Sequence, residues 1–375
     1  MKKLKVVTVV GTRPETIRLS RVINTLNIHP AINHILVHTG QNYDYELNEI
    51  FFEELEIEKP QYVLESKSDS EISTISTILA QIDTLLDKEK PDAFLVLGDT
   101  NSALTAFVAK KKKIPIFHME AGNRCFDERV PEEINRKIID HIADINLPYS
   151  NIARSYLIKE NIPQDRIIKT GSPLFEVLNY YKEKIDSSRI LETLQIEEKS
   201  FFLVSIHRAE NVDNPSNLKK LVETLQKVAT TYQLPVIVST HPRTRKKIDK
   251  SKFNFHNSIH FLKPLGFFDY NFLQKNALVV LSDSGSISEE AAMVGFNAIN
   301  LRETHERPEA MEEASVIMSG LHHNSVIRAI EACKNNITFR KVEAYQTPNV
   351  SEKIVRILLS YTEYVNQNVW KKKND

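Results

Sequence analysis

The sequence predicts an α/β protein with two Rossmann-like, doubly wound parallel-sheet domains that face a cleft. The chain has 375 residues and a mass of 43.1 kDa, which is too long for one ordinary core and favours two domains. Short apolar runs alternate with longer amphipathic ones, as in sheets whose parallel strands are joined by helices. This alternation occurs twice, before and after a polar stretch at Lys182–Lys199 that is expected to form the crossover with short helical pieces.

The first series of elements predicts an N-terminal domain over residues 1–172. Its expected buried strands are Leu4–Val10, Ile35–Thr39, Ala93–Leu97, Ile114–Phe117 and Ile145–Leu147. Helical patterns between them cover Glu71–Leu86, Ser102–Lys110 and Glu132–Ala143. Strands and helices in this order are expected to join through right-handed crossovers.

The second series predicts a C-terminal domain over residues 173–350. Its expected strands are Phe201–Ile206, Val236–Ser239, Ile259–Leu262, Leu278–Leu281 and Ala298–Leu301, and its helices are Ser216–Thr231, Ser286–Val294 and Asn324–Cys333. The last segment, 351–375, contains an amphipathic helix at Ser351–Asn366. We expect this helix to pack back on the first domain.

Composition excludes several classes of protein. Lys+Arg and Asp+Glu are 49 each, so the net charge of +0 offers no basic field for nucleic acid or an anionic membrane. No apolar stretch approaches the roughly 20 residues that span a bilayer. The two cysteines, Cys125 and Cys333, lie outside any CxxC pattern, which excludes disulfide scaffolds and zinc ribbons and fits a reducing cytoplasm. The histidines lack metal-site spacing, so no metal is expected.

Polar residues gather directly after the predicted strands, at the edge where open α/β sheets bind ligands. In Gly11–Arg18, Gly11 permits a tight turn and Pro14 suits the first turn of a helix. The exposed amides of this turn, with Arg13 and Arg18, predict an anion site. The alternative is a plain strand-to-helix turn with two surface arginines. The segment is neither GxGxxG nor a P-loop, so no dinucleotide cofactor or ATP is expected.

Three carboxylates are candidates for proton transfer in the first domain. Asp99 and Glu120 each follow a strand, and Glu132 lies in the first turn of a helix that Pro131 begins. Each has an alternative explanation. Asp99 can cap the next helix, whereas Glu132 can favour the helix dipole and form an i,i+4 ion pair with Arg136.

The second domain carries a predicted phosphate site. His207-Arg208 and His241 follow strands, and His207 is either a proton-transfer group, a phosphate donor or an ordinary hydrogen-bonded histidine. The small-residue turn Ser284-Gly285-Ser286 presents amides and hydroxyls to a phosphate. Glu290, one helical turn later, can accept both ribose hydroxyls; the alternative is a serine-capped helix with an acidic first turn. Arg307 lies on a loop that can close over the same ligand.

Taken together, these motifs resemble the non-hydrolysing UDP-N-acetylglucosamine 2-epimerase family from residue 11 to residue 309. They are Gly11-Thr12-Arg13-Pro14-Glu15, Gly98-Asp99-Thr100, Glu120-Ala121-Gly122, Pro131 to Arg136, His207-Arg208, Ser282 to Gly285, and Thr304 to Glu309. The stretches Glu120–Arg136 and Thr39–Leu47 are similar to one branch in particular. That branch converts UDP-2-acetamido-2,6-dideoxy-L-talose into UDP-N-acetyl-L-fucosamine for capsule or O-antigen sugars.

The resemblance implies a GT-B-like pair of domains, a homodimer, a UDP-sugar substrate, and neither metal nor nicotinamide. By position it assigns the catalytic residues Asp99, Glu120, Glu132 and His207. The full set expected to bind substrate is Arg13, Arg18, Arg136, Arg208, His241, Tyr270, Ser284, Gly285, Ser286, Glu290 and Arg307. The sequence departs from the family pattern at Arg18, usually Lys, at Ser286, usually Gly, and at Asn42, usually His.

The chemistry that the resemblance implies is elimination of UDP to a bound glycal, followed by re-addition of UDP with a proton delivered to the opposite face of C2. Three alternatives remain open at this point. They are epimerisation of UDP-N-acetylglucosamine to the manno sugar, a GT-B glycosyltransferase, and a non-catalytic nucleotide-sugar binding protein.

Overall fold

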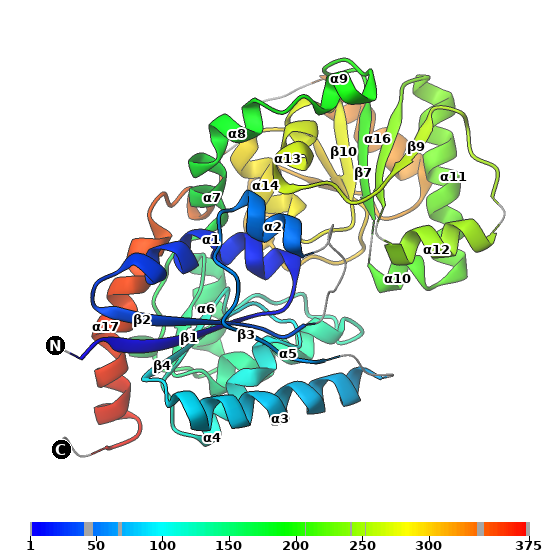
Figure 1. Cartoon of the computed structure of the whole chain (residues 1–375). Helices are drawn as coiled ribbons and strands as arrows, with labels where there is room; N and C mark the ends of the chain where they lie inside the picture. The colour runs from blue at the N-terminus through cyan, green and yellow to red at the C-terminus, as the bar shows by residue number, and fades with distance from the viewer. Residues whose placement is uncertain are drawn as a thin grey trace. The chain divides into compact units, whose positions relative to one another are not determined.

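The structure, a computed structural model, describes residues 2–40, 48–66, 70–206, 208–240, 242–251, 253–335 and 341–372. The chain divides into two compact units (Figure 1). Unit 1 comprises Met1–Asn179 and Glu343–Asp375, and unit 2 comprises Tyr180–Val342. The chain therefore leaves unit 1 once and returns to it near its C-terminus.

Unit 1 is built on a six-stranded sheet whose neighbouring strands are all parallel. The strands are β1 (Leu4–Val10), β2 (Ile32–His38), β3 (Tyr62–Val63), β4 (Ala93–Leu97), β5 (Ile116–Met119) and β6 (Ile145–Leu147). Their order is β3-β2-β1-β4-β5-β6, which is the Rossmann order. Every residue of β4 and β5 is buried, so these strands are continuous apolar or nearly apolar runs, as parallel strands covered on both faces require.

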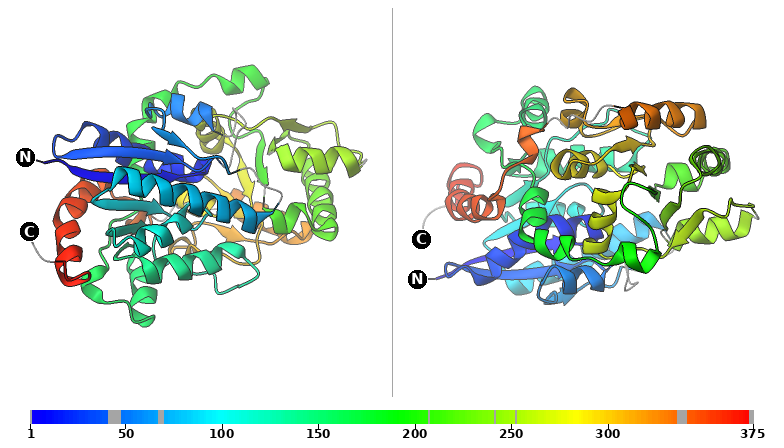
Figure 2. Two further views of the ribbon diagram at one scale, coloured as in Figure 1. Left: turned by 60° about the horizontal axis from the view of Figure 1, so that its bottom comes forward. Right: turned by 90° about the horizontal axis from the view of Figure 1, so that it is seen from above.

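Helices cover both faces of this sheet (Figures 1 and 2). They are α1 (Arg13–Ile28), α2 (Glu49–Glu54), α3 (Glu71–Glu89), α4 (Ala106–Lys111), α5 (Pro131–Ile142), α6 (Asn151–Lys159), α7 (Leu174–Tyr180) and α17 (Val350–Asn368). Apolar residues of α3, α4 and α5 pack with alternate residues of β1, β2 and β4 in one core. On the opposite face lies α1, and α17 packs against it.

The returning C-terminal segment is joined to unit 1 by polar contacts as well as by α17. The backbone N–H of Ser351 donates to Glu176 Oε2 at 2.8 Å, and Lys353 Nζ donates to the carbonyl of Thr170 at 2.7 Å. Gly171, at φ +85°, lies so close to Thr347 that an added Cβ would be 2.1 Å from its hydroxyl. Residues from both ends of the chain thus form one unit.

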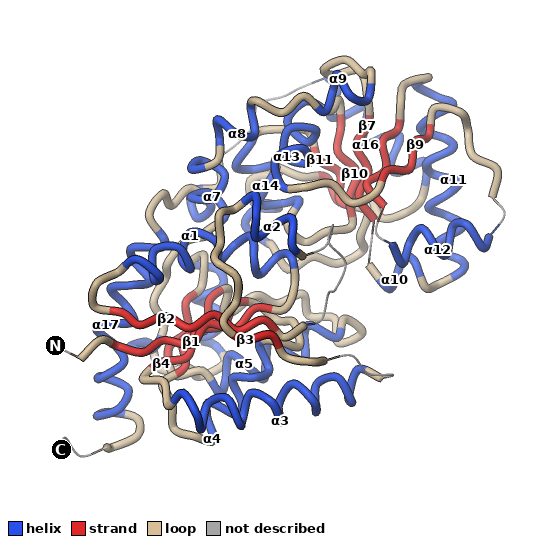
Figure 3. Tube along the Cα trace, in the orientation of Figure 1, coloured by secondary structure: helices blue, strands red, loops and turns tan. Residues whose placement is uncertain are grey.

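Unit 2 repeats the same topology in six parallel strands. These are β7 (Phe202–Ile206), β8 (Val236–Thr240), β9 (Ile259–Leu262), β10 (Val279–Ser282), β11 (Ala298–Asn300) and β12 (Ile317–Met318). Read as β9-β8-β7-β10-β11-β12, the order corresponds strand for strand to that of unit 1. Figure 3 shows the strands of each unit in red.

The helices of unit 2 form two layers. They are α8 (Lys182–Asp186), α9 (Ile190–Leu194), α10 (Ala209–Val212), α11 (Pro215–Tyr232), α12 (Pro242–Ser251), α13 (Phe267–Asn276), α14 (Ile287–Val294), α15 (Pro308–Glu312) and α16 (His323–Asn335). Apolar residues of α11 and α16 form one core with β7, β8 and β10, whereas α9, α13 and α14 form the core on the other face. The short helices α8 and α9 fall within Lys182–Lys199, as predicted.

All ten predicted strands are confirmed, with ends that differ by no more than a few residues. The two edge strands β3 and β12 were missed. Each has only two residues, one half-buried and one exposed, so neither carries the apolar run that marks a buried strand. The predicted segment Ser102–Lys110 begins with a 3-10 turn at Ala103–Thr105 before α4.

Candidate functional site

Several of the predicted site residues lie at the switch point of each sheet, where the strand order reverses direction. In unit 1 this point is between β1 and β4, and in unit 2 between β7 and β10. The loops that follow these four strands carry Gly11–Arg18, Gly98–Thr100, Arg208 and Asp283–Ser286. Open α/β sheets bind ligands beyond the carboxyl ends of strands at this position. Each unit therefore presents one candidate binding edge.

In unit 1 a buried glutamate, Glu15, joins the loops after β1 and β4. Its Oε2 accepts the backbone N–H groups of Gly11 at 2.7 Å and Thr12 at 2.8 Å. Its Oε1 accepts the Thr100 hydroxyl at 2.6 Å and also the Ser102 hydroxyl. Burial raises the pKa of Glu15, although these hydrogen bonds act in the opposite direction.

The predicted anion site in the Gly11–Arg18 turn needs correction. The N–H groups of Gly11 and Thr12 are occupied by the Glu15 carboxylate, so in this structure the anion at the turn is the protein's own side chain. Gly11 has no positive φ, and its turn is stabilised by the capping box of α1 between Thr12 and Glu15. Of the two arginines, Arg13 lies with its guanidinium 5.7 Å from the centroid of the Phe51 ring.

Asp99 lies in a chain of ionic contacts that runs to α5. Arg136 Nε donates to Asp99 Oδ2 at 2.7 Å, and Arg136 Nη1 donates to Glu133 Oε2 at 2.8 Å. Asn135 donates to the backbone carbonyl of Asp99 at 2.9 Å. The Asp99 carboxylate is thus oriented by an arginine rather than capping the next helical turn, where Ser102 is the N-cap residue.

Glu133, next to the predicted Glu132, has the structural role on α5. Its carboxylate accepts the backbone N–H of Cys125 at 3.0 Å and that of Phe126 at 3.2 Å. Burial opposes ionisation, but the Cys125 N–H and the Arg136 guanidinium lower the pKa of Glu133 below its usual value. Glu132 is half-buried in the first turn, which leaves Glu133 as the residue that holds the preceding loop against the helix.

Glu120 combines an ion pair with an unusual backbone. Its Oε2 lies 3.4 Å from Arg18 Nε, and the two side chains are only 10 % and 7 % exposed. The φ of Glu120 is +66°, in the left-handed region that costs a non-glycine residue roughly 1–2 kcal/mol. Such a conformation persists only where several surrounding contacts hold it, and non-glycine residues with strained backbones cluster at functional sites. Asp99 and Glu120 are therefore both carboxylates held on arginines at one edge of unit 1.

In unit 2 the loop after β10 is anchored by the buried Asp283. Its Oδ2 accepts the backbone N–H of Arg208 at 3.1 Å and the Asn211 side-chain amide at 3.0 Å. Ser284 and Ser286 follow Asp283 in the chain, and the oxygen atoms of their hydroxyls lie 2.9 Å apart. Asp283 thus connects the β7 loop to the small-residue turn that was predicted to bind phosphate.

Gly285 faces a carboxylate from another loop. A Cβ at this position would lie 2.0 Å from Glu306 Oε1. Glu306 is 5 % exposed and receives Arg302 Nη1 at 2.7 Å, while Arg208 Nη2 lies 3.5 Å from its other oxygen. The loops after β7, β10 and β11 thus meet around one buried glutamate.

The remaining predicted residues of unit 2 lie on α13, α14 and the β11 loop. Arg307 Nη2 lies 3.0 Å from Glu289 Oε2, with both side chains buried. Glu290 is half-buried, and its Oε2 accepts the Gln274 amide at 2.5 Å. Tyr270 is partly buried against the core that includes α13 and α14.

Two predicted residues, His207 and His241, lie outside the described residues, as does most of the segment Thr39–Leu47. Within the described part of the chain, no group of three or more metal-ligating side chains lies close enough together to hold a metal ion. Over the same residues, no helix is long and apolar enough to cross a bilayer.

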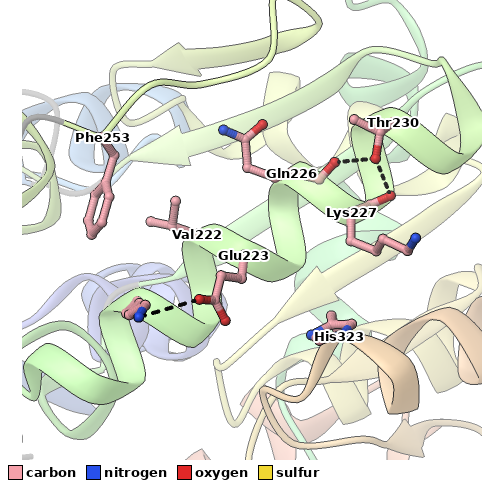
Figure 4. A pocket seen from close by; sticks show the side chains of 8 residues that line it. Val222, Glu223, Gln226, Lys227, Thr230, Phe253 and His323 are labelled. Atoms are coloured by element: carbon pink, nitrogen blue, oxygen red, sulfur yellow. Dashed lines mark hydrogen bonds and ion pairs between the residues drawn. The ribbon is translucent and has the colours of Figure 1, made fainter.

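A groove on unit 2 does not involve the predicted residues (Figure 4). It has a volume of about 480 Å³ and is lined by Lys219, Val222, Glu223, Gln226, Lys227, Thr230, Phe253 and His323. Six of these residues lie on α11, a helix that covers one face of the sheet, and His323 begins α16. The groove is therefore formed by the helical layer and not by the loops at the switch point.

Sequence reasoning missed Glu15, Glu133, Arg302 and Glu306 as organising residues. A signal existed for Glu15, since Thr12-x-x-Glu15 before an apolar run is the pattern of a capping box. No comparable pattern marks Glu306 or Arg302. They pair with each other within one loop, but the neighbours Gly285 and Arg208 of Glu306 come from loops that only the fold brings together.

Two Rossmann-type sheets with polar, charged loops at both switch points define an α/β protein of the nucleotide-binding class. Residues 24–359 match the profile of the family described as UDP-N-acetylglucosamine 2-epimerase. The chain belongs to this family. The prediction of an isomerase, a nucleotide-sugar 2-epimerase, is thereby confirmed.

Relatives cover almost the whole chain. A structure of UDP-N-acetylglucosamine 2-epimerase from Rickettsia bellii is 46% identical, with a TM-score of 0.91, and the alignment covers 99% of this chain and 100% of that one. The UDP-N-acetylglucosamine 2-epimerase of Methanocaldococcus jannaschii is 37% identical over 375 residues, covering 96% of this chain and 100% of its own. These neighbours confirm the GT-B-like fold class.

A relative with a different named substrate is also similar. The UDP-2,3-diacetamido-2,3-dideoxy-D-glucuronate 2-epimerase of Pseudomonas aeruginosa is 32% identical over 329 residues, covering 87% of this chain and 91% of its own. The family therefore includes enzymes that act on different UDP-sugars. Membership alone does not identify the sugar.

Proposed function

We propose that this chain epimerises a UDP-2-acetamido sugar at C2 by elimination and re-addition of UDP. A base removes H2 as a proton while the C1–O bond breaks, so that UDP leaves with the bonding electrons and a C1=C2 glycal forms. UDP then adds back to C1 as an acid delivers a proton to the opposite face of C2. The sequence is redox-neutral and needs two proton-transfer groups and stabilisation of the leaving diphosphate.

The observation that carries this proposal is the pair of carboxylates in unit 1. Asp99 and Glu120 follow adjacent strands, and each is oriented by an arginine. Glu132 on α5 is the third candidate, and we assign His207 with Arg13 to stabilisation of the diphosphate. Arg18 pairs with Glu120, and Arg136 pairs with Asp99. Each guanidinium group would hold its carboxylate in position for the sugar.

For the nucleotide we propose a site on unit 2. The hydroxyls and amides of Ser284, Gly285 and Ser286 would bind the diphosphate, together with Arg208 and His241. Glu290 would accept the ribose hydroxyls, with Tyr270 beside it and Arg307 on the neighbouring loop. Support comes from the Asp283 contacts, which fix this turn against the loop after β7.

Replacement of the carboxylates tests the assignment. Asp99→Asn and Glu120→Gln are expected to lower kcat by about 10²–10⁴-fold each, the usual contribution of one acid or base. UDP affinity, measured by calorimetry, should be retained, because the proposed nucleotide site lies on the other unit. Asp127→Asn, in the same segment of unit 1, is the matched control and should leave turnover near that of the wild type. Near-normal turnover of both site variants would refute the assignment.

Solvent exchange tests the reaction class. In deuterium oxide, a C2 epimerase incorporates deuterium at C2 of the sugar, which NMR detects directly. A glycosyltransferase or a binding protein would not do so. Absence of exchange with every UDP-2-acetamido sugar offered would therefore refute the proposed chemistry.

For the sugar itself we propose UDP-2-acetamido-2,6-dideoxy-β-L-talose, converted to UDP-N-acetyl-β-L-fucosamine for capsule or O-antigen biosynthesis in the cytoplasm. The resemblance of Glu120–Arg136 to that branch supports this choice. A 6-deoxy sugar needs apolar surface at C6, and Phe126 offers it. This residue is 71% exposed, and the centroid of its ring lies 5.4 Å from that of Tyr156 in an edge-to-face contact. Cys125 is less suitable, because its thiol lies 3.4 Å from the Glu133 carboxylate.

The second candidate is epimerisation of UDP-N-acetylglucosamine to UDP-N-acetylmannosamine, which the names of the relatives from Rickettsia bellii and Methanocaldococcus jannaschii favour. A C6 hydroxyl packed against Phe126 in the bound state would be left without a polar partner, at roughly 1–3 kcal/mol, or about ten- to a hundredfold in specificity. Side-by-side kcat/KM values for the two sugars decide between them. Equal or better turnover of UDP-N-acetylglucosamine would establish the second candidate.

We further propose that the chain forms a homodimer through unit 1. Large apolar side chains are exposed on three helices, and α4 lies against both α3 and α5. They are Ile72 on α3, Phe107 on α4, and Ile134 and Ile138 on α5. Light scattering should give twice the chain mass for the wild type and for Ile28→Glu, an exposed control on α1, but the single-chain mass for Ile138→Glu. A monomeric wild type would refute the proposal.

A further inference from the structure

A chain of four buried or half-buried charges lies behind Asp99 and Glu120 in unit 1. It runs from His118 on β5 to Asp140 on α5, then to Arg124, and ends at Glu160 at the C-terminal end of α6. His118, Asp140 and Arg124 are at most 2 % exposed, and only the Glu160 side chain, at 28 %, reaches solvent. None of the four belongs to the site described above, so their role is open.

Both ring nitrogens of His118 face oxygen atoms. Nε2 lies 2.8 Å from the carbonyl oxygen of Gly98, and Nδ1 lies 2.9 Å from Asp140 Oδ1. A carbonyl has no hydrogen to give, so Nε2 must be the donor there. A neutral imidazole has only one N–H, and an imidazolium has two. The contact of Nδ1 with Asp140 has an ion-pair distance but is not an aligned hydrogen bond. With Asp140 ionised, a neutral imidazole would bring the lone pair of Nδ1 to 2.9 Å from a carboxylate oxygen, whereas an imidazolium carries the positive charge that this contact requires.

Asp140 is held in its ionised form by its other neighbours. Arg124 Nη1 donates to Asp140 Oδ2 at 2.7 Å, and the backbone N–H of Gly122 donates to the same oxygen at 3.1 Å. Arg124 is neutralised in turn by Glu160, through contacts of 2.8 Å and 2.6 Å. The chain of charges thus alternates in sign and sums to zero, which makes burial of each member tolerable.

The charge chain reaches the backbone on both sides of the reacting carboxylates. The Gly98 carbonyl that accepts from His118 directly precedes Asp99, and Gly98 itself has a φ of +75°. Gly122, which donates to Asp140, is two residues after Glu120, and His118 is two residues before it. Glu120 has the positive φ that needs such support.

We infer that His118 is a positioning residue, held as an imidazolium between Gly98 and Asp140, which fixes the backbone of Asp99 and Glu120 for proton transfer. This inference rests on the proposed epimerisation. The groups that face His118 agree with its charge. Burial is the largest single influence and lowers the pKa of His118, but the interactions with Asp140, the Gly98 carbonyl and Glu120 together raise it above its usual value. Arg124 carries the same positive charge as the imidazolium, but it is paired with Glu160 and Asp140.

The protonation state is tested on the unmodified chain. In ¹⁵N-labelled protein at neutral pH, NMR should show two protonated ring nitrogens for one buried histidine, and this signal should be missing from His118→Gln. A single protonated ring nitrogen at His118 would overturn the inference. This measurement does not require turnover, so it remains decisive if the proposed reaction proves wrong.

The positioning role is tested by kinetics with the UDP-sugar that the chain turns over. His118→Gln and Asp140→Asn should each lower kcat by about ten- to a hundredfold, the scale expected for a misplacement near 1 Å. UDP affinity should change by less than about twofold. Lys137→Gln, on the same helix as Asp140 and paired with Glu128 outside the charge chain, is the matched control and should keep its kcat. Unchanged kcat in either buried variant would overturn the role.

Folding and function are distinguished by two further readouts. Trp370, the single tryptophan of the chain, lies in unit 1 and reports by its fluorescence whether each variant folds. If His118→Gln does not fold, the two-proton NMR signal of the wild type and the kcat of Asp140→Asn still decide the inference. A wild type without epimerase activity would refute the proposed function and leave the ring protonation to be tested by itself.

Discussion

Replacement of Glu15 should separate two contributions to unit 1, the capping of α1 and the joining of two loops. Glu15→Ala leaves the N–H groups of Gly11 and Thr12 without their carboxylate partner. A buried donor left unsatisfied costs about 1–3 kcal/mol, so the two together predict a loss of about 2–6 kcal/mol in the free energy of unfolding. This value lies at the upper end for one substitution.

Glu15→Gln should be much milder. The retained amide oxygen can accept the two backbone N–H groups, and the hydroxyls of Thr100 and Ser102 can rotate to accept from the new NH₂ group. What is lost is the charge assistance of these hydrogen bonds, for which we expect about 1–2 kcal/mol. We therefore expect the free energy of unfolding to increase from Glu15→Ala to Glu15→Gln to the wild type, with the larger difference between the two variants.

Urea unfolding followed by the fluorescence of Trp370 is the suitable assay. Trp370 is the only tryptophan, and its ring lies 4.9 Å from the ammonium group of Lys110 within unit 1. Glu71→Gln, an exposed first-turn glutamate of α3, is the control and should change stability by less than about 0.5 kcal/mol. An unchanged unfolding midpoint for Glu15→Ala would refute the reasoning, since it would mean that the capping box and the loop contacts contribute nothing.

Three other outcomes follow from the described contacts. Glu290→Ala should weaken UDP binding in calorimetry by about 1.5–3 kcal/mol, the scale of hydrogen bonds to a charged group, and unchanged affinity would restore a purely helix-stabilising role. Gly122→Ala should destabilise unit 1 more than Gly98→Ala: both glycines have positive φ, but a Cβ on Gly122 would lie 2.4 Å from the Ala153 carbonyl oxygen, whereas Gly98 has open space. Equal melting temperatures would contradict this. Burial acts to raise the pKa of Asp140, but contacts with His118 and Arg124 lower it below its usual value. The Asp140 carboxylate therefore stabilises the fold at a pH above its pKa in the unfolded chain, about 3.9. This stabilisation is lost as the pH falls through the lower pKa of the folded state. Urea midpoints at pH 5 and pH 3 should therefore differ more for the wild type than for Asp140→Asn.

The fold was predictable because buried parallel strands are continuous apolar runs. The bounds of β1, β4, β6 and β9 agree with the predicted ones at both ends. The edge strands β3 and β12 were not predictable, because two residues at a solvated edge carry no periodic pattern. Their position is set by pairing with β2 and β11, which only the folded sheet provides.

The location of the candidate site was predictable, but the pairing of its charges was not. Carboxylates directly after apolar runs predicted polar loops at the carboxyl ends of strands, where Asp99 and Glu120 lie. That Arg136 pairs with Asp99, and Arg18 with Glu120, depends on helices α5 and α1 packing beside those loops. On α5, Glu132 and Glu133 are chemically identical neighbours. The fold turns Glu133 inward, and nothing in two adjacent glutamates states which of them a helix will bury.

The resemblance to the family implies a glycine at position 286, and the small-residue turn explains physically how a serine is accommodated there. A glycine is needed where the backbone has a positive φ or where another group approaches closely. At Gly285 the second reason applies, because Glu306 occupies the space of a side chain. Ser286 has φ −71° and ψ −20°, a conformation open to any residue, and it is the N-cap of α14. A hydroxyl can therefore replace the usual glycine there without strain, and its contact of 2.9 Å with Ser284 adds a second hydroxyl to the proposed diphosphate site.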